Sequence, residues 1–328
     1  MTTLTFFIIM FAALLHASWN ALVKGGSDKR LQMTAIALGH LPFAPIAIYF
    51  APPLNFACWP NLLLGGIFHF GYQYYLVQSY NKGDLSQVYP IARASAPLIV
   101  TLISLFILDV DLSFSELTGI SLIALGLFTI SGIHNKNIPN LAVKSALITG
   151  CFIAAYSITD GYGGRVGESP VAFYGWLTLI NGPVWLIYIG YVSPSSIPKM
   201  FGTAKWLFLG GGFASFLAYS LIMYAFSKAP IALVMALRET SIIFALLLGT
   251  FFLKEKMTFI RIIGVLSGFI GALILILYGP KTSFNAPNIP LGNILFILNS
   301  TTYGLYLIFV KSLVEKYHII TLFRWLFL

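Results

Sequence analysis

A long stretch of the chain, residues 65–97, reads GGIFHFGYQYYLVQSYNKGDLSQVYPIARASAP and has a counterpart at residues 210–242, GGGFASFLAYSLIMYAFSKAPIALVMALRETSI. When the two are aligned with a shift of 146 residues, which sets Gly65 on Gly211, identical residues coincide at several positions, among them Lys82 with Lys228, Val88 with Val234, and Ser95 with Ser241. The start of the chain likewise matches the sixth apolar run, with Trp19 falling on Tyr156. Self-similarity of this kind indicates an internal repeat. The sequence therefore predicts two homologous halves.

The amino-acid composition indicates whether these halves are surrounded by water or by lipid. Of 328 residues, 58% are hydrophobic and 9% are charged, with a mean hydropathy of +0.88. A soluble domain carries about 25% charged residues. A chain so poor in charge cannot cover a surface that faces water, so we expect it to lie in a lipid bilayer. The net charge of +9 resides in short linkers, which suits loops beside an anionic leaflet and not a nucleic-acid partner.

Runs of about 20 apolar residues are typical of membrane-spanning helices. Ten such runs are separated by short polar linkers: 4–24, 31–51, 59–80, 85–108, 114–133, 141–163, 170–190, 203–227, 231–253 and 258–279. We therefore predict an all-α membrane protein with ten transmembrane helices, divided into five-helix repeats at 1–137 and 138–280. The remaining segment, 281–328, predicts an extra helix and a partial one.

Because five crossings are an odd number, the second repeat must enter the membrane from the opposite face. The loop charges support this inversion. Loops one and three of the first half are basic, as are loops seven and nine: Lys24, Lys29, Arg30 and Lys82; then Lys199, Lys205, Lys254, Lys256 and Arg261. The positive-inside rule then places the N-terminus outside the cytoplasm. Inverted repeats suit alternating access around a central site, so the sequence favours a transporter.

Four motifs carry a family resemblance: LLHASWNALVKGGSDK, VYPIARASAPLIV, AAYSITDGYGGR and ALRETSIIFALLLGTFFLKEKMTFIRIIG. Together they resemble the ten-helix EamA-type members of the drug/metabolite transporter superfamily over about residues 1–280. The resemblance implies a multi-pass protein of the plasma membrane that exports amino acids or other small metabolites through a central cavity. It also implies cytoplasmic termini, which conflicts with the loop charges.

The segment 281–328 has no place in a ten-helix member. Tyr306 and Lys311 repeat the five-residue spacing of Trp19 and Lys24. The segment therefore resembles the start of another repeat, and we expect a truncated or fused product whose tail packs at the edge of the transport unit.

Polar residues in the first helix are costly unless they face a partner or water. His16, Asn20 and Lys24 lie four residues apart, on one helix face, with Trp19 beside them. One interpretation is that these residues line the substrate path. The other is that they are structural, with Asn20 bonding to a neighbouring helix and Lys24 extending its charge to the membrane interface. His16 occupies about the place where small multidrug relatives carry a proton-coupling carboxylate. An inert buried histidine is the alternative.

Charged residues within predicted spans are the strongest site candidates. Arg93, with Tyr89 one turn before it, could bind a carboxylate or phosphate through its guanidinium group. Its repeat counterpart is Glu239, beside Arg238. The alternative is a structural charge network that joins Arg93 to Glu239 or to Asp160. The two interpretations are compatible if the pair breaks during transport.

Other features read as structural. Gly264, Gly268 and Gly271 are spaced for close helix contact, either between the two halves or between protomers of a homodimer. His40 and His69 lack metal-ligand spacing and read as packing or hydrogen-bonding residues, so we expect no metal and no cofactor. Tyr72, Tyr75, Tyr156 and Trp176 are weaker cavity candidates.

Two alternatives to a metabolite exporter remain. A carrier or flippase for a nucleotide-linked or lipid-linked sugar would share the fold and differ in cavity size. A membrane-embedded, lipid-modifying enzyme would need clustered carboxylates or a His/Asp pair near one membrane face, whereas the intramembrane acids here are scattered. We therefore expect a transporter with a small-molecule substrate and no enzymatic activity.

Overall fold

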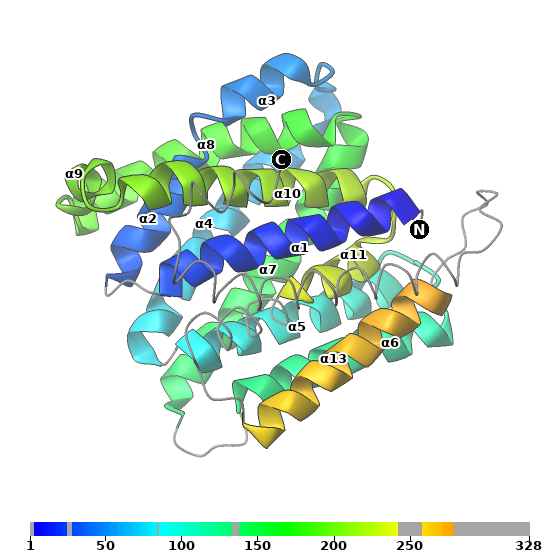
Figure 1. The fold of residues 1–328 in the computed structure, drawn as a ribbon. Coiled ribbons are helices and arrows are strands. Elements are labelled where there is room, and N and C mark those ends of the chain that lie inside the picture. The colour runs from blue at the N-terminus through cyan, green and yellow to red at the C-terminus, as the bar shows by residue number, and fades with distance from the viewer. Residues whose placement is uncertain (1–2, 25–27, 84, 133–137, 242–257, 279–328) are drawn as a thin grey trace, which may run out of the picture. The chain divides into compact units, whose positions relative to one another are not determined.

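The computed structural model describes residues 3–24, 28–83, 85–132, 138–241 and 258–278, without the side chains of 3, 18–24, 85 and 86. The chain divides into two compact units, of which the first holds 1–246 and 257–282 and includes every described residue. The second, 247–256 with 283–328, lies outside the described residues, so the expectations for Tyr306 and Lys311 stay predictions. Within the described ranges every regular element is a helix (Figure 1).

The elements up to residue 131 are α1 (Thr3–Lys24), α2 (Lys29–Gly39), α3 (Ala44–Phe50), the 3₁₀ turn η1 (Phe56–Cys58), α4 (Trp59–Lys82), α5 (Leu85–Phe106) and α6 (Phe114–Ser131). Those that follow are α7 (Asn140–Val166), α8 (Pro170–Val192), α9 (Ser196–Phe201), the π-helical turn η2 (Leu207–Gly211), α10 (Gly212–Phe226), α11 (Ile231–Arg238) and α13 (Phe259–Tyr278). Helix is confirmed at some part of each of the ten expected runs.

Seven helical segments in the described ranges are long and apolar enough to cross a membrane: 29–50, 87–106, 114–131, 140–166, 170–192, 207–226 and 259–278. The helix α4 has sufficient length, but His69, Gln73 and Gln78 reduce its hydropathy. The span expected at 231–253 is described only to residue 241.

The span expected at 31–51 is interrupted. The helix α2 ends at Gly39, and α3 begins at Ala44, with Pro45 in its first turn. Proline favours a helix start because its missing N–H has no partner there in any case. A side chain at Gly39 would collide with the backbone carbonyl of Phe208, so glycine permits η2 to approach α2 closely. His40 follows this break.

The glycines of α13 pack against α6 of the same chain, side by side in Figure 1. A Cβ atom built on Gly264 would lie 2.6 Å from the Gly126 carbonyl oxygen, and one on Gly271 would lie 2.6 Å from that of Gly119. Gly268 is also within this contact, with its Cα 3.2 Å from a Cβ built on Gly126. Small residues let helix backbones meet in this way. The glycines therefore join two helices of one chain and are not a surface for pairing protomers.

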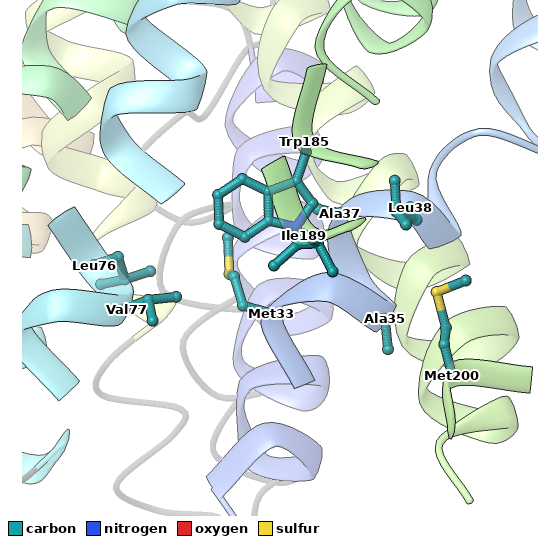
Figure 2. Close-up of a cluster of buried hydrophobic side chains, with 9 residues drawn as sticks. All are labelled: Met33, Ala35, Ala37, Leu38, Leu76, Val77, Trp185, Ile189 and Met200. Atoms are coloured by element: carbon teal, nitrogen blue, oxygen red, sulfur yellow. The ribbon is translucent and has the colours of Figure 1, made fainter. Parts of the chain in front are cut away.

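A hydrophobic cluster connects α2, α4, α8 and α9 (Figure 2). Trp185 is fully buried and packs with its neighbours in the cluster: Met33, Ala35, Ala37, Leu38, Leu76, Val77, Ile189 and Met200. The members on α2, α4 and α8 lie within about two turns of the helix ends at Lys29, Lys82 and Val192. The cluster therefore fills the bundle near the ends of these helices.

Candidate substrate site

A polar cavity of about 70 Å³ lies within the bundle. Its lining comes from eight helices, α1, α2, α4, α5, α7, α8, α10 and α11. Four tyrosines contribute to it: Tyr72, Tyr156, Tyr174 and Tyr219. Met33 and Ala37 belong both to this lining and to the hydrophobic cluster. The cluster therefore closes one side of the cavity.

A buried ion pair beside the cavity connects α5 with the end of α11. The Nε atom of Arg93 donates to Oε2 of Glu239 over 2.7 Å, and the two residues are 2% and 0% exposed. Arg238 approaches the other carboxylate oxygen, with 3.6 Å between its Nε and Oε1 of Glu239. The carboxylate of Glu239 thus interacts with two arginines. This confirms the pairing of Arg93 with Glu239 that the sequence suggested.

Tyr89 connects this ion pair to α1. Its hydroxyl lies 3.0 Å from Nε2 of His16, and the guanidinium carbon of Arg93 lies 5.8 Å from its ring centroid. Residues four apart on a helix are neighbours on its surface, which brings Tyr89 and Arg93 together. His16 therefore lines the cavity and contacts the Arg93 region through Tyr89.

Asp160 on α7 is fully buried and belongs to a separate cluster. Its Oδ2 atom lies 2.7 Å from Nε2 of His69 and accepts a hydrogen bond of 2.8 Å from the Tyr219 hydroxyl. The ring of Tyr156 stacks on His69, with 4.2 Å between centroids. The alternative pairing of Asp160 with Arg93 is wrong. The carboxylate of Asp160 instead contacts His69 on α4 and Tyr219 on α10.

Several buried polar atoms beside the cavity have no hydrogen-bond partner within the described part of the chain. They are Nη2 of Arg93, Nε and Nη2 of Arg238, Oε1 of Gln73, Nε2 of His40, Oγ1 of Thr178 and Oδ1 of Asn181. Buried polar groups nearly always have partners in folded proteins. Donors and acceptors without partners around one cavity are therefore suited to water or to a polar ligand.

The remaining sequence candidates have mixed outcomes. Trp19 and Asn20 lie on α1, where their side chains are outside the described residues. Trp176 is 37% exposed, packs near Trp59 and is not among the residues that line this cavity. Tyr75 stacks on Phe152 and does not line the cavity either. Tyr72 and Tyr156 do line it.

Sequence reasoning missed part of the lining. His40 and His69 were assigned to hydrogen bonding, which is confirmed by Tyr174 and Asp160, but both also line the cavity. Six further polar residues received no role: Gln73, Tyr174, Thr178, Asn181, Ser215 and Tyr219. The available signal was their polarity within apolar runs. No group of three His, Cys, Asp or Glu side chains that could hold a metal occurs in the described ranges.

Long apolar helices, many large hydrophobic side chains exposed on the outer surface, and a buried polar cavity define a multi-pass membrane protein. Residues 140–277 match the EamA-like transporter family. This match covers the second of the two expected repeats and supports the resemblance to EamA-type transporters there. The fold of the chain is similar to a protein of known crystal structure, with a TM-score of 0.66 and 16% identity, over 85% of this chain and 98% of that one. No curated protein matches by sequence.

Proposed function

We propose that the chain exports a small metabolite, an amino acid or a similar organic anion, across the plasma membrane by alternating access through the central cavity. The observation that carries the proposal is the Arg93–Glu239 pair, buried at the cavity and contributed by aligned positions of the two sequence repeats. An ion pair between halves stabilises one arrangement, and its separation frees charged groups for a substrate.

The packing of the helices supports two inverted halves. If α1 corresponds to α7, α4 to α10, and α6 to α13, then exchanging the halves converts the α4–α7 contact into the α10–α1 contact. The same exchange leaves the α6–α13 contact unchanged, because each of these two helices takes the place of the other. The glycines of this contact follow the same rule, because Gly119 and Gly126 are seven residues apart, as are Gly264 and Gly271. This relation is what a pseudo-two-fold axis in the membrane plane would produce.

The chemistry of the cavity favours a small anionic or zwitterionic substrate. Arg93 and Arg238 each have an Nη2 atom without a partner, and two such donors suit a carboxylate. The aromatic rings around them suit an organic body.

The test is transport by the purified full chain in proteoliposomes, screened against labelled amino acids, carboxylates and phosphorylated metabolites. The variant Arg93→Gln should insert and fold but lose transport, because Glu239 keeps Arg238 as a partner while the guanidinium group is removed. Lys144→Gln changes a cation on the exposed start of α7, away from the cavity, and should transport normally. Saturable transport at the normal rate by Arg93→Gln would refute the proposed role of this residue.

A further inference from the structure

The charges around the cavity sum to zero in the described part of the chain. Arg93 and Arg238 supply two positive charges, and Glu239 and Asp160 supply two negative charges, when the histidines are neutral. Each of these four residues is at most 3% exposed. A net charge in such an environment is costly, so the cluster is most stable near neutrality.

An anionic substrate would disturb this balance. The unpartnered Nη2 atoms of Arg93 and Arg238 offer it hydrogen bonds, but its charge would leave the buried cluster with one excess negative charge. A proton that binds at the same time would cancel that excess. The molecule therefore needs a second group that can accept a proton near the cavity.

The His69–Asp160 pair has the geometry for this role. Nε2 of His69 and Oδ2 of Asp160 are 2.7 Å apart, and the His69 side chain is 13% exposed while Asp160 is fully buried. The other oxygen of Asp160, Oδ1, has no hydrogen-bond partner among the residues that the structure describes. Gly65 makes room for it, because a Cβ atom there would lie 2.7 Å from Oδ1.

Tyrosines and a histidine from four helices lie around the pair. Tyr219 on α10 donates to Oδ2, Tyr156 on α7 stacks on the imidazole, and Tyr174 on α8 lies 4.8 Å from Tyr219, ring to ring. His40 on α2 binds Tyr174. Arg238 supplies a cation close to this group, with its guanidinium carbon 5.9 Å from the Tyr219 ring centroid. Both members of the pair carry atoms that can accept a proton, an imidazole nitrogen on His69 and the carboxylate oxygens on Asp160.

We propose that the His69–Asp160 pair binds one proton when the cavity binds an anionic substrate, and that the chain carries the proton and the anion together. The proton enters from water on the side where the anion enters, adds to the imidazole nitrogen or the carboxylate, and leaves with the anion on the other side. This inference rests on the proposed function. Its consequence is electroneutral export, in which an accumulated metabolite leaves down its own gradient whatever the membrane potential.

The test uses proteoliposomes that contain the full chain and a trapped pH dye. The probes are matched pairs of impermeant solutes, L-glutamate with L-glutamine and L-aspartate with L-asparagine. Wild type should acidify the lumen by about one proton for each anion taken up, and the neutral partner should carry none. Clamping the membrane potential with potassium and valinomycin should leave the rate of anion uptake unchanged.

The variants separate this coupling from transport itself. Asp160→Asn and His69→Gln should lower the protons carried per anion from about one to near zero and make anion uptake sensitive to potential. Two variants are used because either one could fold poorly. Glu116→Gln is the matched control, since Glu116 is a buried carboxylate in a capping box at the start of α6 and should keep full coupling. Normal proton uptake in both pair variants overturns the proposal.

The two proposals fail in different ways. Anion uptake by wild type without acidification overturns the coupling and leaves the transport function intact. Failure of wild type to take up either anion overturns the choice of anionic substrate together with the coupling. Equal acidification by glutamate and glutamine also overturns the charge argument, because it would assign the proton to something other than the anion.

Discussion

At the scale of single residues, Glu239 is the most constrained member of the site. It is fully buried and lies within reach of two arginines, at 2.7 Å from Arg93 and 3.6 Å from Arg238. If Arg93 is removed, Glu239 retains one cationic neighbour. If Glu239 is removed, both arginines lose the carboxylate that they share. Glu239 and Arg93 therefore do not contribute equally to this ion pair.

This asymmetry predicts that Glu239→Gln destabilises the protein more than Arg93→Gln does. Leaving a buried charge without its partner costs about 3–5 kcal/mol, so Glu239→Gln should approach that range and Arg93→Gln should remain below it. Thermal unfolding of the purified variants in detergent gives the comparison. Adding Arg93→Gln to the Glu239→Gln variant should recover part of the loss. Equal destabilisation by the two single changes would contradict the shared role of Glu239.

The site residues that the sequence indicated are those whose burial in lipid is most costly. Arg93, Asp160 and Glu239 stand out because a charge within an apolar run needs a partner. Neutral groups such as Gln73 and Asn181 have a smaller cost and give a weaker signal. Which way they face depends on neighbouring helices from distant parts of the chain. His69 illustrates the limit, because its partner, Asp160, lies 91 residues away in sequence.

At the scale of helices, the positions of apolar runs were predictable because length and hydropathy follow from the thickness of a bilayer. The interruption between α2 and α3 was not predicted, although Pro45 marks it. The turn depends on tertiary contacts, with Tyr174 bonded to His40 and η2 pressed against Gly39. The sequence also did not indicate which helix packs against the glycine face of α13. The spacing of the glycines predicts a close helix contact but does not identify the partner helix.

The contact between α6 and α13 predicts a position-specific effect of adding one methyl group. A Cβ atom on Gly126 would lie 2.5 Å from the carbonyl oxygen of Gly264, so Gly126→Ala should force the helices apart and cost about 1–3 kcal/mol. Gly210→Ala is the control, because a Cβ atom there has no other atom within 4 Å. It should be neutral or slightly stabilising. Similar melting temperatures for the two variants would contradict the close contact.

At the scale of the whole molecule, membrane orientation decides the direction of export. A chain that crosses back and forth returns to one face after every second crossing. Most cations near the described helix ends belong to one such face: Lys29, Arg30, Lys82, Lys144, Lys199 and Lys205. Arg165 and Lys228 belong to the other face. Arg165 donates to the backbone carbonyls of Phe226 and Ala229, each over 2.8 Å. Its local structural role explains its presence there.

The positive-inside rule then predicts that the face with Lys199 is cytoplasmic and that the loop with Asn55 is outside. In a chain whose Cys58 and Cys151 are replaced by alanine, Asn55→Cys should react with a membrane-impermeant maleimide in intact cells. Ser195→Cys should react only after the cells are permeabilised. Both positions are exposed, so a difference in labelling reports sidedness and not burial. The reverse pattern would place the N-terminus in the cytoplasm, as the family resemblance implies, and would show that local contacts such as those of Arg165 outweigh loop charge in this protein.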